Sequence, residues 1–377
     1  MPGREDTANR RARLHEVETK LALLRERLDV TGRSAVALTT QASVAWLAAG
    51  LTNPIDRSDP ESLLWLVVHE DGVAAVTTTV ERPRLEAEAG LEEIGFTLVE
   101  VPWHDSDAFA QAAEKITGLR WTELAPDEDD LTALRLRLLP SERERLAGLG
   151  ADAAGALEAV VSAWVPGERD LDLQARVAEH LERVDAIPVC LIVGGDERVE
   201  RFRHPLASGM PVEKLVMAVV VAMRGGLHAA ATRFASAGPL SDSVRAAFDA
   251  AFEVEAAMLD AHRRGSPYGA VLEACDEAYA AVGHPGAWRE HYQGGPVGYR
   301  QREFELAPSQ RESRWYTQSI EVGHAVAWNP SVAGGGKVED TFLVEESGLR
   351  RLTDTGSWQA IEVWGGRTRC GVLDIAR

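Results

Sequence analysis

The segment KLVMAVVVAMRGGLHAAATRF, Lys214 to Phe234, contains two apolar runs joined at Arg224-Gly225-Gly226. Short continuous apolar runs bounded by glycine are typical of buried strands. The segment therefore predicts two strands connected by a tight turn. No acidic residue occurs between Glu213 and Asp242, so neither strand can supply a carboxylate to a site that it borders.

Outward from this segment, apolar runs alternate with helical patterns through the second part of the chain. Strands are expected at 187–194, 214–222 and 227–234, helices at 241–264 and 267–282, and a β-rich part after residue 290.

The first part of the chain, residues 1–125, has its own alternation of helix and strand patterns. Residues 9–29 have apolar positions at helical spacing with charges between them, and the runs on either side of Asp71-Gly72 indicate a hairpin. The run FTLVEVPW indicates another strand. This alternation predicts an α/β domain.

A Pro/Asp-rich linker separates the two parts. Ser141 and Glu144 follow Pro140 with the spacing of a capping box, which predicts the start of a helix. We therefore expect an α/β two-domain protein with domains at 1–140 and 141–377.

Composition narrows the class of protein. The chain has 377 residues, and its formal net charge of −19 disfavours a nucleic-acid partner, because phosphate binding needs a basic surface. No apolar run is long enough to span a bilayer, and the charged start has no signal-peptide pattern. The three cysteines are widely spaced, which suggests reduced thiols and a cytoplasmic location rather than a zinc site.

Short motifs follow one another in a recognisable order along nearly the whole chain. They are SVAWLAAG, VPGERDLDLQARVAEHL, RFRHPLASG, LHAAATRF, EHYQGGPVGYR and AVAWNPSVAGGGKVEDTFLVEESGLRRLT. Together they resemble the creatinase, prolidase and aminopeptidase P family, whose catalytic half has the pita-bread fold shared with methionine aminopeptidases. The resemblance implies a creatinase-like N-terminal α/β domain followed by a pita-bread α+β domain.

The chain differs from that family at the positions of the metal ligands. Catalytic members hold two divalent metals through two Asp, one His and two Glu, which suit such cations and activate a bound water. Aligned position by position, these ligands fall at Val219, Ala230, Gly295, Asn329 and Glu339. One carboxylate and a neutral amide cannot hold two metals. We therefore expect no metal, no other cofactor and no metallo-aminopeptidase activity.

The resemblance also places a set of side chains on or near the emptied cavity. We expect catalytic roles for His204, His291 and Glu339, and substrate-binding roles for Arg233, Tyr299, Arg300, Trp328 and Asn329. The resemblance also implies that His228 lies on or near the same cavity.

Each of these roles has a structural alternative. His204 lies in a polar run that reads as a loop, where a histidine suits proton transfer but can equally be a solvated loop residue. His291, beside Gly294-Gly295, can act chemically or hold its loop in place. Glu339 can serve as a base, orient a cationic substrate, or form a buried pair with Arg233.

The substrate-binding residues have alternatives too. Arg300 can clamp a carboxylate or remain solvated, and Asn329 can offer its amide to a substrate carbonyl. Trp328 suits a core or lid position at least as well as a substrate-binding one.

Three functions remain open. The first is a metal-independent enzyme that hydrolyses or eliminates at a C–N or similarly activated bond of a small amino-acid-derived metabolite by histidine acid/base catalysis. The second is a non-catalytic pseudo-peptidase that binds a peptide or protein partner. The third is a biosynthetic lyase or cyclase that uses the same site. Resemblance to creatinase-type relatives further implies a homodimer.

Overall fold

The computed structural model describes residues 7–363 and 367–376. It divides into two compact units that meet between Arg135 and Leu136, where the sequence led us to expect a boundary near residue 140. Each unit is described by itself.

The first unit is a four-stranded sheet with helices. The strands, in the order β1-β2-β3-β4, are Val36–Thr40, Glu61–His69, Gly72–Thr78 and Phe96–Val101. The helices are α1 (Thr7–Thr31), α2 (Gln41–Leu47), α3 (Arg82–Glu88), α4 (Ala108–Thr117), α5 (Trp121–Leu124) and α6 (Glu128–Leu136). The predicted hairpin is present, because β2 and β3 pair antiparallel with His69 opposite Gly72.

The second unit contains the segment Lys214–Phe234. Its helices are α7 (Pro140–Ser162), α8 (Asp170–Glu182), α9 (Glu197–Arg201), α10 (Asp242–Ala261) and α11 (Tyr268–Ala281). Its strands include β5 (Ile187–Gly195), β6 (Leu215–Arg224), β7 (Leu227–Ser236), β8 (Gly294–Val297), β9 (Ala325–Trp328), β10 (Ser331–Val332), β11 (Gly336–Lys337), β12 (Asp340–Glu345), β13 (Gly348–Arg351), β14 (Ala360–Val363), β15 (Arg367–Cys370) and β16 (Leu373–Asp374).

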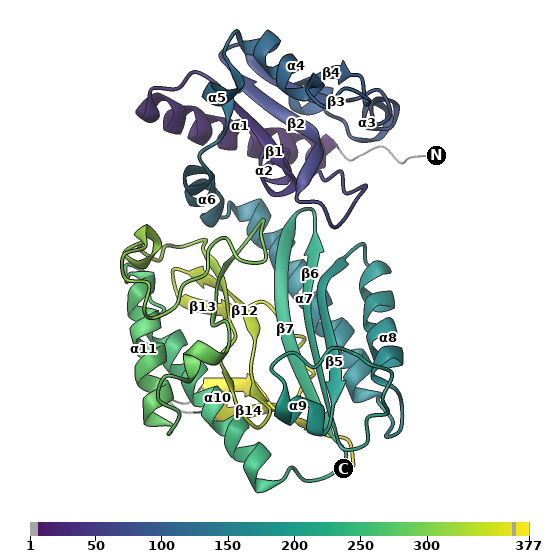
Figure 1. Ribbon diagram of the computed structural model, residues 1–377, viewed down its shortest axis with the longest axis vertical. Helices are drawn as coiled ribbons and strands as arrows, with labels where there is room; N and C mark the ends of the chain where they lie inside the picture. The colour runs from purple at the N-terminus through teal and green to yellow at the C-terminus, as the bar shows by residue number, and fades with distance from the viewer. Residues whose placement is uncertain (1–6, 364–366, 377) are drawn as a thin grey trace. The chain divides into compact units, whose positions relative to one another are not determined.

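Two four-stranded sheets form the framework of this unit. β6 and β7 are the predicted pair of strands, and they lie in a sheet of order β16-β7-β6-β5, with α7 and α8 packed against it (Figure 1). The second sheet has the order β13-β12-β9-β8.

The two sheets are joined where β12 approaches β7. The Thr232 N–H donates to the Glu339 carbonyl at 3.0 Å. The Thr341 hydroxyl bonds to both the N–H and the carbonyl of Ala230, at 2.8 and 2.9 Å. Glu339 is thereby held against the strands that carry Val219 and Ala230.

The start of α7 differs from the predicted one. The helix begins at Pro140, and the Leu139 N–H donates to the carboxylate of Glu142 at 2.6 Å. Glu142, not Glu144, therefore caps the helix. Glu142 is fully buried and also accepts a hydrogen bond from the Tyr299 hydroxyl at 2.6 Å.

A buried ionic network ties the two sheets and α10 together. Asp340 accepts from Arg233 at 2.9 Å and lies 3.1 Å from a guanidinium nitrogen of Arg369. Arg369 also donates to Glu255 at 2.6 Å, and Arg233 donates to Glu158 at 3.1 Å. Every side chain of this network is buried, so each charge depends on its partner for compensation.

Three histidines in this unit, His262 and His324 buried and His228 partly buried, make its stability sensitive to acid. Burial lowers the pKa of His228 and of His324 to about 4, and that of His262 to about 3. The unfolded chain therefore binds more protons than the folded chain once the pH falls below about 6.5. We expect the free energy of unfolding to be unaffected by these groups above that pH and to fall steadily between pH 6.5 and 4.

Urea denaturation at a series of pH values measures this slope. His324→Gln should flatten the slope, whereas the same change at the exposed His180 should leave it unaltered. An unchanged slope in His324→Gln would contradict the assignment.

Candidate functional site

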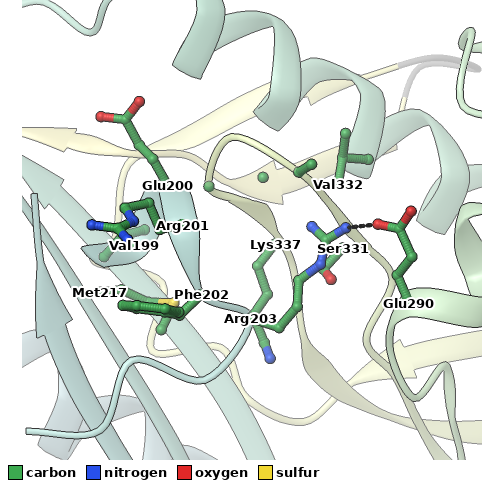
Figure 2. Close-up of a pocket in the computed structure, with 13 residues that line it drawn as sticks. Val199, Glu200, Arg201, Phe202, Arg203, Met217, Glu290, Ser331, Val332 and Lys337 are labelled. Carbon is green, nitrogen blue, oxygen red and sulfur yellow. Dashed lines mark hydrogen bonds and ion pairs between the residues drawn. The ribbon is translucent and has the colours of Figure 1, made fainter. Parts of the chain in front are cut away.

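A small cavity opens beside the loop that follows α9. Its volume is about 150 Å³. It is lined by α9 and the residues after it (199–203), Met217 of β6, Glu290, and the β10–β11 ribbon (331–333 and 335–337). Figure 2 shows the Lys337 side chain between those of Met217 and Arg203, while Arg203 turns to Glu290, 2.8 Å away.

Lys337 connects this cavity with the two histidines that the sequence singled out. Its Nζ lies 3.2 Å from Nε2 of His291, and the same His291 nitrogen lies 3.1 Å from Nε2 of His204. The structure therefore brings His204 and His291, which are far apart in sequence, into direct contact. His204 lies on an irregular, exposed loop, whereas His291 and Lys337 are buried.

Burial and the neighbouring Lys337 ammonium disfavour protonation of His204 and His291. Burial, followed by the charge of Lys337, lowers the pKa of His291 to about 2 and also lowers the pKa of His204. Burial lowers the pKa of Lys337 as well, although the charge of Glu339 opposes this shift. Both histidines are therefore neutral near pH 7.

The tautomers follow from the bonding. An ammonium can only donate, so Nε2 of His291 accepts from Lys337. The hydrogen shared by the two imidazoles is then carried by Nε2 of His204, which leaves Nδ1 of His204 with a lone pair. His204 is thereby able to accept a proton from a substrate or from water.

Glu339 has a different partner from the one considered in the sequence analysis. Its carboxylate accepts from Arg302 at 2.8 Å, and the Arg302 side chain is 17% exposed. Arg233 instead binds Asp340 and Glu158. The Glu339–Arg233 pairing is therefore wrong by one residue, because Arg233 binds Asp340, the first residue of β12. The Arg302 guanidinium instead holds Glu339, the surviving carboxylate of the family's ligand set.

The residues at the ligand positions do not fit a pair of metals. Val219 and Ala230 offer no donor atom, and Asn329 offers only an amide. A Cβ atom at Gly295 would lie 2.7 Å from the Phe304 carbonyl oxygen, so a histidine could enter there only if the backbone shifted. In the part of the chain that the structure describes, no group of three or more His, Cys, Asp or Glu could hold a metal ion.

Three of the expected substrate-binding residues lie away from the cavity. Arg233 is fully buried in the ionic network, and the hydroxyl of buried Tyr299 donates to Glu142. The indole of Trp328 is buried and donates to His262 at 3.4 Å. These side chains stabilise the fold, and we assign them no contact with substrate.

The other two, Asn329 and Arg300, are also absent from the lining of this cavity. Asn329 follows β9 and its N–H donates to the Gln293 carbonyl at 3.0 Å. Its side-chain oxygen is buried and has no hydrogen-bond partner in the structure, so this oxygen is available to accept a hydrogen bond. Arg300 is partly exposed, and its N–H donates to Glu303 at 3.2 Å.

Sequence reasoning missed three cations: Lys337, Arg302 and Arg203. Arg302 lies two residues beyond Arg300 in the same run, GYRQRE. The sequence analysis expected Arg300 of this run to bind substrate, but it did not identify Arg302, whose side chain reaches Glu339. Lys337 offered a signal that was not used. Lysine is scarce in this chain, with four residues, so a lysine inside the motif AVAWNPSVAGGGKVEDTFLVEESGLRRLT stands out.

Comparisons with known proteins agree with this architecture. The model of metallopeptidase family M24 matches residues 147–346. Dipeptidase PepE from Mycobacterium ulcerans is 18% identical with a TM-score of 0.74, over 96% of this chain and 98% of that one. The prolidase from Pyrococcus horikoshii OT3 is 16% identical with a TM-score of 0.72, over 89% and 98%.

A third structure extends the range of these similarities. The N-terminal domain of FACT complex subunit SPT16 from Cicer arietinum is 12% identical with a TM-score of 0.66, over 91% of this chain and 97% of that one. No curated protein sequence matches the chain. The two-domain, pita-bread fold expected from the motifs is confirmed.

None of the helices in the described residues is both long enough and apolar enough to cross a bilayer.

Proposed function

This chain belongs to metallopeptidase family M24, and we propose that it is a member that works without metal. It hydrolyses or eliminates at a C–N or similarly activated bond of a small amino-acid-derived metabolite. The observation that carries this proposal is the contact between His204, His291 and Lys337 beside a cavity.

His204 is the proton-transfer residue of this proposal. It is neutral near pH 7, and its free Nδ1 suits a general base that activates water or removes a substrate proton. His291 orients the His204 ring through their Nε2–Nε2 contact. Its contact with Lys337 extends this hydrogen-bonded chain, along which positive charge can be shared. Asn329 can accept a hydrogen bond from a substrate N–H through its unpartnered side-chain oxygen, and Arg302 orients the Glu339 carboxylate.

Turnover in the presence of a chelator tests this function. The purified chain is incubated with a panel of amino-acid amides, N-carbamoyl and N-amidino amino acids, with and without EDTA, and products are identified by mass spectrometry. We expect turnover of at least one class at the same rate in both conditions. Turnover that requires added Mn, Co or Zn would contradict the proposal.

A non-catalytic binding role is the second candidate. It is favoured by the loss of ligands at Val219, Ala230 and Gly295, and the similar SPT16 structure is described as part of a FACT complex subunit. A chain that converts no member of the panel yet retains a specific peptide would support this role. The third candidate is a biosynthetic lyase or cyclase, and the products distinguish it from a hydrolase. A lyase or cyclase releases an unsaturated or cyclic product and incorporates no water.

We further propose that the protein is a cytoplasmic homodimer without a cofactor. The dimer is inferred from creatinase-type relatives, and the location from the three widely spaced cysteines. Light scattering at micromolar concentration should give twice the chain mass of 40.9 kDa. A monomer mass would count against the dimer.

A further inference from the structure

The Ser331 hydroxyl is a polar group of the small cavity that the proposed mechanism does not use. Ser331 is 1% exposed, and its hydroxyl has no hydrogen-bond partner among the residues that the structure describes. Its backbone is engaged, since the N–H donates to the Tyr279 hydroxyl at 3.0 Å and the carbonyl lies 3.2 Å from the same hydroxyl. An unpaired buried hydroxyl costs free energy. Because Ser331 lines the cavity, a bound molecule can supply the missing partner.

Arg203 gives the same cavity a cation whose present partner can be replaced. Its side chain is 20% exposed, whereas that of Glu290, 2.8 Å away, is 61% exposed. Ion pairs that are open to solvent contribute little to stability, so an anion in the cavity can take the place of the Glu290 carboxylate. The Glu200 carboxylate does not compete, because it is exposed and points away from Arg203 (Figure 2).

The loop that carries Arg203 is held in place by a buried carboxylate. Asp170 accepts from the Ser208 N–H at 3.0 Å. Arg198 donates to Asp170 at 3.1 Å and to the Leu206 carbonyl at 2.6 Å. The loop is thereby fixed before a ligand arrives, which reduces the entropy cost of binding.

The cavity limits the size and the chemistry of its ligand. Its volume of about 150 Å³ suits about six heavy atoms, since a cavity of this size accommodates benzene. Met217, Phe202 and Val332 supply apolar walls. A guanidinium such as that of Arg203 binds a carboxylate in a planar, two-point geometry. The Ser331 hydroxyl can donate to a remaining lone pair of the same carboxylate.

We propose that this cavity is a subsite for a short-chain aliphatic carboxylate, which Arg203 and Ser331 bind after it displaces Glu290 from Arg203. Arg203 immediately precedes His204 in the same loop, which connects the subsite with the proton-transfer residue. The inference rests on the proposed function only in assigning this carboxylate to the substrate. The substrate class is thus narrowed to metabolites that keep a free carboxylate on a short apolar chain.

Binding of isobutyrate tests the proposal without any turnover. Isobutyrate and the neutral isobutyramide have the same shape and number of heavy atoms, so their comparison isolates the charge. The methyl signal of each is titrated with the intact chain by saturation-transfer NMR at neutral pH and constant ionic strength. We expect isobutyrate to bind at least about tenfold more tightly than isobutyramide. Equal dissociation constants would overturn the proposal.

Three variants test the residues that form the subsite. Arg203→Gln should weaken isobutyrate binding by at least about thirtyfold, because a charge-assisted two-point contact is lost. Ser331→Ala should weaken it by about three- to tenfold, the range for a single neutral hydrogen bond. Glu290→Gln should strengthen it by up to about fivefold, because the competing carboxylate is removed.

A matched control makes the result specific. Arg183→Gln removes an arginine that is likewise paired with a glutamate, Glu179 at 2.6 Å, but lies outside the cavity. It should leave the dissociation constant of isobutyrate unchanged, and thermal melts establish that every variant is folded. Unchanged binding in a folded Arg203→Gln, or weaker binding in Glu290→Gln, would contradict the proposal. Inorganic phosphate that binds more tightly than isobutyrate would overturn the carboxylate assignment.

The outcomes separate this inference from the proposed function. Isobutyrate binding with the expected order of variants supports the subsite even when no member of the substrate panel is converted, and the proposed function then fails alone. Where a substrate is found, Arg203→Gln should raise its KM by at least about thirtyfold with little change in kcat. An unchanged KM would remove Arg203 from substrate binding and leave the result of the chelator experiment intact.

Discussion

His204→Ala should lower kcat/KM by about 10²- to 10⁴-fold, the range typical of a lost general base. The loop position of the side chain means that little packing is lost, so the free energy of unfolding should change by no more than about 1 kcal/mol. Steady-state kinetics on the substrate found in the chelator-treated panel, together with a urea melt, measures both quantities.

The pH profile adds a readout that a merely structural role would not move. Since the pKa of His204 is lowered by burial and by Lys337, the base stays neutral as the pH falls through about 6.5, the ordinary histidine value. Activity should therefore decline only below that pH in the wild type. Full activity in His204→Ala would remove this residue from the mechanism, and His291 would be tested next.

Asp340→Asn should destabilise the second unit by about 3–5 kcal/mol, the cost typical of breaking a buried ion pair. The Asp340 carboxylate is shared by Arg233 and Arg369 and also accepts from Thr353 at 2.7 Å. Its neutralisation leaves two buried guanidiniums undercompensated. Urea denaturation followed by tryptophan fluorescence gives the loss.

Two matched controls bracket this effect. Glu339→Gln alters the neighbouring carboxylate, but its partner Arg302 is closer to solvent, so the loss should be clearly smaller. Glu179→Gln breaks the exposed pair with Arg183 and should leave the free energy of unfolding essentially unchanged. Equal losses in Asp340→Asn and Glu339→Gln would contradict the assignment of the network.

The framework of the second unit was predictable because its signals are local. The apolar runs of β5, β6 and β7 end at glycines or turn residues, and the amphipathic patterns of α10 and α11 have the length of helices. The start of α7 was less predictable, because two capping patterns overlap there. Ser141 with Glu144 has the spacing of a capping box, and so does the Leu139 N–H with Glu142. The choice of Glu142 depends also on its bond to Tyr299, which is distant in sequence.

The site was predictable only in part, because partner choice depends on which face of a strand a side chain occupies. Glu339 and Asp340 are consecutive, and neighbouring residues of a strand point to opposite faces. Arg233 therefore meets Asp340, while Glu339 faces Arg302. The contact between His204 and His291 joins two loops that are distant in sequence, and no local sequence pattern predicts that they meet. Only the resemblance to a known family placed the two histidines at one site.

Metal content tests the central claim, that this M24 member has exchanged its metal centre for a cluster of amine and imidazole side chains. The native chain is dialysed against excess Mn, Co, Zn or Fe, freed of unbound metal, and analysed by inductively coupled plasma mass spectrometry. We expect no stoichiometric metal, because side chains without donor atoms occupy three of the five ligand positions and Arg302 holds the Glu339 carboxylate. Two equivalents of metal retained per chain would contradict the account.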